Sequence, residues 1–125
     1  MVVLKLLYLL ETNELLIIKK GIMKKILLVC CAGMSTSLLV NRMREVAKTK
    51  EIDCKIWSTS EKELPNEFAQ EPADVILVGP QIRYLLNNIK KEVNNTVPVE
   101  LIDMRIYGMM DGEKVLNQAL NALEK

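Results

Sequence analysis

The segment KKILLVCCAGMSTSLLVNRMREVAK, residues 24–48, joins a short apolar run to a longer amphipathic pattern. The apolar run at residues 24–30 is short and continuous, as is typical of a buried strand. From residue 35 to residue 48, the apolar side chains Leu39, Met43 and Val46 recur at helical spacing. The segment therefore predicts a strand, a turn and a helix.

The rest of the chain continues this alternation of strands and helices. Further strands are predicted at residues 54–59, 74–79 and 99–103, and further helices at residues 80–93 and 111–125. Residues 61–70 are predicted to form a polar connector with at most a short helix around Pro65. Because strands that alternate with helices imply right-handed crossovers, the predicted fold class is α/β. We expect an open sheet of four parallel strands, flanked by helices in three layers.

Composition predicts one domain without a strong electrostatic field. A chain of 125 residues, 50% of them hydrophobic, suffices for one compact core. Its net charge of +1 and its few aromatic residues, 4% of the chain, offer little to nucleic acid. Three cysteines, an odd number, favour a reducing compartment, and cytoplasm is the natural interpretation. With no histidine there are too few ligands for a metal site, and no nucleotide-binding glycine pattern occurs, so neither metal nor cofactor is expected.

The N-terminal residues 1–22 precede the predicted domain, which comprises residues 23–125. The apolar stretch MVVLKLLYLL is too short to span a membrane and is not followed by a cleavage site. The adjoining KKGIMKK corresponds to purine-rich codons, as in a ribosome-binding site that precedes a start at Met23. Residues 1–22 are therefore either a start-site artefact or a genuine additional helix.

Three of the predicted strands end in residues that are candidates for a binding site. Cys30, Gly79 and Asp103 each close a strand, and ligands of open parallel sheets bind at the carboxyl ends of the strands. We therefore expect these residues to face one crevice, with Pro80 and Gln81 beside them. Tyr107 is expected in a neighbouring loop, where it either lines the crevice or builds a turn. Asp103 is a candidate general acid, although a residue at this position often only caps a loop.

The loop after Cys30 contains small residues followed by hydroxyl residues, directly before the predicted helix. Unpaired N–H groups and the positive end of the helix dipole suit an anion at this place. The same field favours the thiolate form of Cys30 without any histidine. In the simpler interpretation, the hydroxyl residues cap the helix and the cysteine is a small apolar core residue. The predicted phosphate-binding loop comprises Cys31, Ala32, Gly33, Met34, Ser35, Thr36 and Ser37.

Three stretches of the chain, ILLVCCAGMSTSLLVNRM, ADVILVGPQIRYLL and VELIDMRIYGMMDGEKVL, resemble a known family. It is the enzyme IIB component of the lactose, cellobiose and diacetylchitobiose class of the bacterial phosphotransferase system. The resemblance implies a fold similar to low-molecular-weight tyrosine phosphatases. It also implies that Cys30 accepts a phosphoryl group from a phosphohistidine of the IIA component. Cys30 then passes it to a disaccharide, of the cellobiose type or a related β-glucoside, that enters through the membrane component IIC. Such a phosphotransferase enzyme is cytoplasmic and peripherally associated with IIC.

Cys31 departs from the pattern of this family, which leaves open which of the two neighbouring thiols reacts. A redox-sensitive pair of Cys30 and Cys31 is the lesser alternative, because adjacent cysteines form a disulfide only with strain. Thr36 occupies the place where the phosphatases carry an arginine, and Arg42 comes too late in the predicted helix to replace it. A small phosphatase-like module, or a redox or anion-binding module built on the Cys30 loop, is the alternative function.

Overall fold

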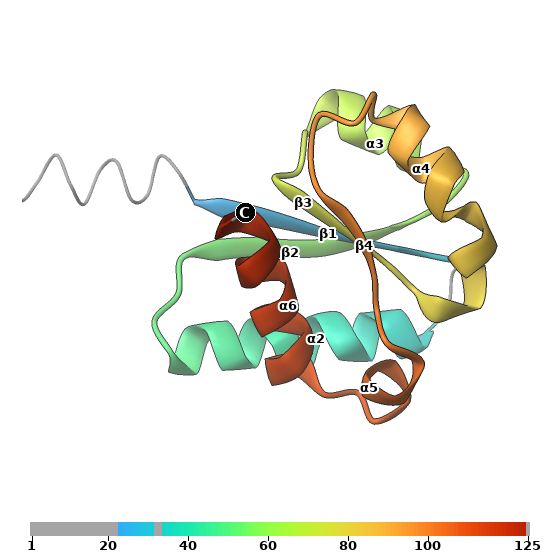
Figure 1. The fold of residues 1–125 in the computed structure, drawn as a ribbon. Coiled ribbons are helices and arrows are strands. Elements are labelled where there is room, and N and C mark those ends of the chain that lie inside the picture. The colour runs from blue at the N-terminus through green and yellow to red at the C-terminus, as the bar shows by residue number, and fades with distance from the viewer. Residues whose placement is uncertain (1–22, 32–33, 125) are drawn as a thin grey trace, which may run out of the picture.

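Four strands form one parallel sheet in the order β2-β1-β3-β4 (Figure 1). The strands are β1 (Lys24–Cys30), β2 (Cys54–Ser60), β3 (Val75–Val78) and β4 (Val99–Leu101). The computed structural model describes residues 23–31 and 34–124, and at Met34 and Ser35 it describes the backbone alone. The expectations for residues 1–22, for the loop positions Ala32 and Gly33 and for those two side chains therefore lie outside the described residues. The predicted α/β fold with four parallel strands is confirmed.

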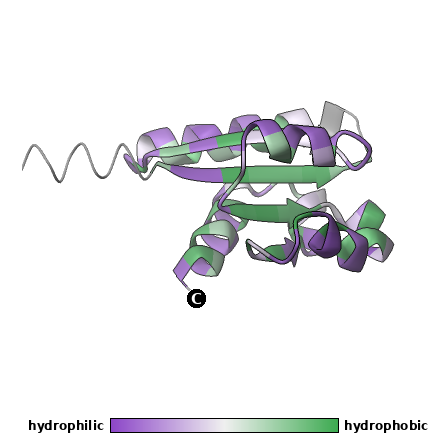
Figure 2. Ribbon diagram, turned by 90° about the horizontal axis from the view of Figure 1, so that it is seen from above, coloured by the Kyte–Doolittle hydropathy of each residue, from purple (hydrophilic) through white to green (hydrophobic). Residues whose placement is uncertain are grey.

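The helices cover both faces of the sheet and complete three layers (Figure 1). Helices α2 (Met34–Thr49) and α6 (Gly112–Glu124) lie on one face. The other face carries α3 (Leu64–Gln70), the 3-10 helix η1 (Pro80–Leu85) and α4 (Leu86–Glu92). Figure 2 shows the hydrophobic strands between helices that are partly hydrophilic. The short helix around Pro65 is thus confirmed as α3.

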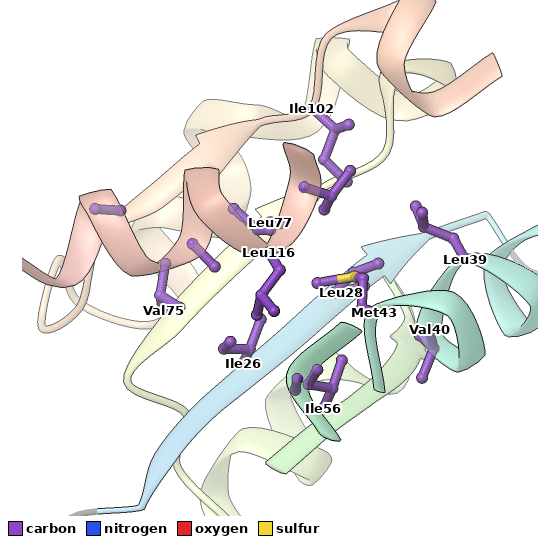
Figure 3. Close-up of a cluster of buried hydrophobic side chains, with 14 of the residues drawn as sticks. Ile26, Leu28, Leu39, Val40, Met43, Ile56, Val75, Leu77, Ile102 and Leu116 are labelled. Atoms are coloured by element: carbon purple, nitrogen blue, oxygen red, sulfur yellow. The ribbon is translucent and has the colours of Figure 1, made fainter. Parts of the chain in front are cut away.

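Strand β1 contributes alternate side chains to two separate cores. Ile26 and Leu28 belong to the cluster under α2 and α6, which Figure 3 shows between the sheet and these helices. Leu27 and Val29 belong to the cluster on the opposite face. Successive side chains of a strand point to opposite faces, so this alternation directs Cys30 toward the α2 side. The prediction that β1 is buried on both faces is confirmed.

The order of the strands creates a switch point between β1 and β3. From β1 the chain runs to the edge strand β2, and it then returns across β1 to form β3 on the other side. The connections after β1 and after β3 therefore diverge to opposite faces of the sheet, and ligands of open α/β sheets bind where this happens. Cys30 ends β1 at this point, and Gly79 directly follows β3.

The predicted helix at residues 80–93 is in fact interrupted. Pro80 starts a 3-10 helix, as expected from its fixed backbone angle, but Ile82 departs from helical geometry with φ −117° and ψ 30°. The break lets Ile82 enter the core beneath this turn, while Ile89 of α4 is buried in the same cluster. Tertiary packing therefore overrides the regular helical pattern here.

The segment after β4 also differs from the prediction. The predicted strand at residues 99–103 ends at Leu101, and Tyr107 lies on a short helix, α5 (Met104–Gly108), instead of in a loop. The side chain of Asp103 accepts hydrogen bonds from the backbone N–H groups of Arg105 and Ile106. An aspartate in this role starts a helix, which explains why the strand cannot continue.

Candidate functional site

The side chain of Cys30 is buried at the carboxyl end of β1. Its exposed fraction is 4%, and its sulfur lies 2.5 Å from the hydroxyl oxygen of Thr36. Thr36 belongs to the first turns of α2, so the strand and the helix that follows it meet at this contact. The candidate nucleophile and the candidate phosphate-loop hydroxyl are thus brought together as expected.

Thr36 also connects the sulfur to α5. Its hydroxyl oxygen lies 3.1 Å from the hydroxyl of Tyr107, which is 5% exposed. Thr36 itself is 4% exposed. Among the described residues it is the one buried residue with a polar or charged side chain, when cysteine and tyrosine are counted as apolar. Sequence reasoning placed Tyr107 near the crevice but missed its contact with Thr36, since the two residues are 71 positions apart.

Gly79 lies directly against Cys30. A Cβ atom on Gly79 would stand 3.1 Å from the Cβ atom of Cys30 and 3.2 Å from the side-chain oxygen of Gln81. The backbone N–H of Gly79 donates to the carbonyl of Val29 at 2.8 Å, which continues the pairing of β1 with β3. Pro80 is buried and Gln81 is exposed. The turn after β3 thus closes around the cysteine because its first residue has no side chain.

Asp103 is exposed and serves as the N-cap of α5. Its Oδ1 atom accepts from the N–H of Arg105 at 2.8 Å and from the N–H of Ile106 at 3.1 Å. Of the two interpretations of Asp103, the geometry therefore favours the cap. The residue also lines an open groove of about 490 Å³ together with Glu100, Leu101, Ile106, Lys114, Asn117, Gln118 and Asn121. Cys30 is not among these lining residues.

The three cysteines occupy different environments and form no disulfide among the described residues. Cys30 is buried, Cys31 is exposed, and Cys54 is partly buried beside the core cluster under α2 and α6. Burial raises the pKa of the Cys54 thiol, the Asp53 carboxylate adds to the rise, and Lys24 opposes it. Cys54 is thus most simply a core residue. The remaining loop candidate, Ser37, is exposed.

Four of the exposed large apolar side chains lie on or next to the elements that follow the carboxyl ends of β1, β3 and β4. They are Leu38 on α2, Tyr84 on η1, Met104 at the start of α5 and Met109 directly after it, exposed by 45%, 76%, 59% and 65%. Met23, before β1, and Leu101, at the end of β4, are exposed by 38% and 36%. Met110, in contrast, is partly buried and packs against the core. A contiguous group of exposed apolar side chains often marks a surface that contacts a partner.

The described residues hold neither a metal-binding cluster nor a membrane-crossing helix. Within residues 23–31 and 34–124, no three His, Cys, Asp or Glu side chains are placed so that they could hold a metal ion. No helix in the described part of the chain has the length and apolar character needed to cross a bilayer.

Comparison with known proteins identifies the family. Residues 25–118 match the family model described as "PTS system, Lactose/Cellobiose specific IIB subunit". The chain belongs to this family. As a IIB protein, it is a phosphotransferase component of a sugar-transporting phosphotransferase system, and such components work with IIA and IIC components. The resemblance inferred from the sequence is confirmed.

Curated relatives of this IIB protein are named for several sugars. The oligo-beta-mannoside-specific EIIB component of Bacillus subtilis (strain 168) is 42% identical over 102 residues, which cover 81% of this chain and 97% of the relative. The cellobiose-specific EIIB component of Lactococcus lactis subsp. lactis (strain IL1403) is 39% identical, covering 80% of this chain and 96% of the relative. The galactose-specific EIIB component of L. lactis subsp. cremoris (strain MG1363) matches equally well.

Solved structures agree with the assignment of the fold. A cellobiose-specific IIB component from Borrelia burgdorferi superposes with a TM-score of 0.66 at 41% identity, covering 81% of this chain and 92% of the other. The lactose-specific IIB domain from Streptococcus pneumoniae gives a TM-score of 0.70 at 19% identity, covering 79% of this chain and 96% of the other. The second likeness concerns the fold alone. IIB domains have a phosphatase-like fold, so this expectation is also confirmed.

Proposed function

We propose that this IIB protein carries a phosphoryl group on the sulfur of Cys30. The observation that carries the proposal is the position of the buried sulfur, at the end of β1 beside the switch point of the sheet and within 2.5 Å of the Thr36 hydroxyl. The thiolate is the nucleophilic form of a cysteine, and the Thr36 hydroxyl is placed to donate to this sulfur. Cys31, whose side chain is exposed, is the alternative nucleophile, and the variants below distinguish the two thiols.

The phosphoryl donor is a phosphohistidine of the IIA component. The chain itself contains no histidine, so the donor imidazole must come from another protein. In the first transfer the S–P bond of Cys30 forms while the N–P bond of the phosphohistidine breaks, and the imidazole nitrogen keeps the electron pair. In the second transfer a sugar hydroxyl attacks phosphorus, loses its proton and displaces the Cys30 thiolate. The two steps leave the protein unchanged and phosphorylate the sugar.

The acceptor is a sugar that arrives through the membrane component IIC. We propose a β-linked disaccharide of the cellobiose type or a related β-glucoside, because one relative and one solved structure are named for cellobiose. The protein would act in the cytoplasm and associate peripherally with IIC. The exposed apolar side chains on the elements that follow β3 and β4, which include Tyr84 and Met109, are suited to contact with both partners in turn.

The loop is suited to hold phosphate and not to hydrolyse it. Thr36 offers a hydroxyl where phosphatases carry an arginine, and a guanidinium would clamp the phosphoryl oxygens in the transition state. Without that cation, water attacks the phosphocysteine less readily. A carrier needs this property because its phosphoryl group must wait for the sugar.

Intact-mass spectrometry tests the proposal directly. The protein is incubated with phosphoenolpyruvate, the two general phosphotransferase proteins and a matching IIA. The wild type is expected to gain one phosphoryl group, Cys30→Ser to gain none, and Cys31→Ser to gain one as the wild type does. A phosphorylated Cys30→Ser with an inert Cys31→Ser would reassign the site to Cys31. No addition to the wild type would favour a redox or anion-binding module.

A further inference from the structure

We propose that Tyr107 is a positioning residue for Cys30, which it serves by orienting the hydroxyl of Thr36 toward the sulfur. This inference deepens the proposed function, because it concerns the same sulfur atom. It starts from a continuous chain of three side chains, with 2.5 Å from sulfur to Thr36 and 3.1 Å from Thr36 to Tyr107. The three residues are 4%, 4% and 5% exposed, so little water competes for these contacts.

The direction of the hydrogen bonds follows from the number of available protons. A threonine hydroxyl has one hydrogen to donate and can accept from another donor. When the Tyr107 hydroxyl donates to Thr36, the single hydrogen of Thr36 remains available for the sulfur. The hydroxyl of Thr36 is then fixed toward the sulfur, the atom that must attack phosphorus, and holds it in one position. Chains of hydrogen bonds in a low-dielectric interior also strengthen one another.

The framework around Tyr107 holds the ring in place. Tyr107 lies on α5, which Asp103 caps through two backbone N–H groups. Tyr107 is part of the core cluster that also contains Leu39 of α2. Packing in this cluster therefore fixes the position of the tyrosine hydroxyl. Phenylalanine at this position would keep the packing and remove only the hydroxyl.

Charged side chains on the elements that follow β1, β3 and β4 are exposed. Arg42 on α2, Arg83 on η1, and Asp103 and Arg105 at α5 are all exposed. Arg42 donates a hydrogen bond to the carbonyl of Met110. Among the described residues, the side chain recorded within hydrogen-bond distance of the Cys30 sulfur is that of Thr36. The hydroxyl pair is therefore the feature whose removal should change the reactivity of Cys30.

The test is the rate at which iodoacetamide alkylates Cys30 at one fixed pH, without any phosphoryl donor. Intact-mass spectrometry follows the reaction in a full chain that carries Cys31→Ser and Cys54→Ser, so that Cys30 is the thiol that reacts. We expect Thr36→Val to slow the alkylation about tenfold, and Tyr107→Phe about threefold. Thr36→Ser, which keeps the hydroxyl, is expected to restore the wild-type rate. Tyr84→Phe removes an exposed tyrosine hydroxyl and serves as the matched control, with no change expected.

A double variant separates positioning from a general effect on the fold. Because Tyr107 acts through Thr36, Thr36→Val combined with Tyr107→Phe should slow the alkylation no further than Thr36→Val alone. A Tyr107→Phe rate equal to that of Tyr84→Phe would overturn the proposal, and so would full additivity in the double variant. If Thr36→Val does not fold, the comparison of Tyr107→Phe with Tyr84→Phe still decides. A wild type that takes no phosphoryl group while Tyr107→Phe slows the alkylation would refute the proposed function and leave this inference standing.

Discussion

Gly79 and Cys30 lie so close together that a methyl group on Gly79 would stand 3.1 Å from the Cβ atom of Cys30. This distance is shorter than ordinary contacts between carbon atoms, so an alanine at position 79 must displace the cysteine by a few tenths of an ångström. The absence of a side chain after β3 is therefore a requirement of the site and not only of the turn.

Gly79→Ala should slow phosphorylation of the protein by IIA. We expect a roughly threefold to tenfold loss, because a misplacement of about 1 Å can cost on the order of a hundredfold. Time-resolved intact-mass spectrometry measures the rate. Gly108→Ala is the matched control, since a Cβ atom there would meet nothing within 4 Å. Equal rates for both variants would show that the sulfur tolerates the displacement.

Asp103→Asn should leave phosphoryl transfer nearly unchanged, because asparagine caps a helix as well as aspartate does. Asp103→Ala should lower the free energy of unfolding by about 1 kcal/mol, since it removes the acceptor of the two N–H groups at the start of α5. Urea unfolding and the phosphorylation rate are measured on the same preparations. A large loss of transfer in a stable Asp103→Asn protein would instead identify Asp103 as a general acid.

Gly112→Ala should destabilise the fold through the contact between α6 and α2. A Cβ atom at Gly112 would lie 2.7 Å from the carbonyl carbon of Arg42 and 2.8 Å from the backbone nitrogen of Met43. Since backbone cannot move aside as a flexible side chain can, we expect a loss of about 1–3 kcal/mol in urea unfolding. Gly108→Ala again provides the control, with little change expected. If Gly112→Ala left the midpoint of urea unfolding unaltered, α2 and α6 would be able to move apart at little cost in free energy.

The stability of the protein should decrease at alkaline pH because of Cys54. Burial raises the pKa of this thiol above its ordinary value of 9.0, with a further rise from Asp53. The folded state therefore keeps the proton at a pH where the unfolded chain has lost it. The free energy of unfolding then falls as the pH rises through 9.0 and levels off above the folded-state pKa.

Cys54→Val removes the titrating thiol, and valine is a residue that suits a strand. Because the thiol is gone, the free energy of unfolding of this variant should fall less between neutral and alkaline pH than that of the wild type. Asp53→Asn should give an intermediate decrease. Urea unfolding under reducing conditions at several pH values provides the measurement. If the free energy of unfolding decreased equally with pH in the wild type and in Cys54→Val, the role assigned to burial of this thiol would be wrong.

Local sequence patterns were sufficient to predict most of the fold. The apolar run of β1 and the helical spacing in α2 are features of neighbouring residues, and both elements form as expected. The same is true of the apolar face of α6, where Val115, Leu116 and Ala119 are buried. Such apolar patterns predict a helix or strand reliably because burial of its apolar face stabilises the element, whichever other segment it packs against.

The sequence alone also determined that a cysteine ends a central strand at a loop of small and hydroxyl residues. Only the tertiary structure decided what surrounds that cysteine. The break at Ile82, the helix α5 and the contact of Thr36 with Tyr107 all depend on packing between distant segments, and the last joins residues 71 positions apart. No local periodicity encodes such a contact, because its free energy comes from burying both partners together in the assembled core.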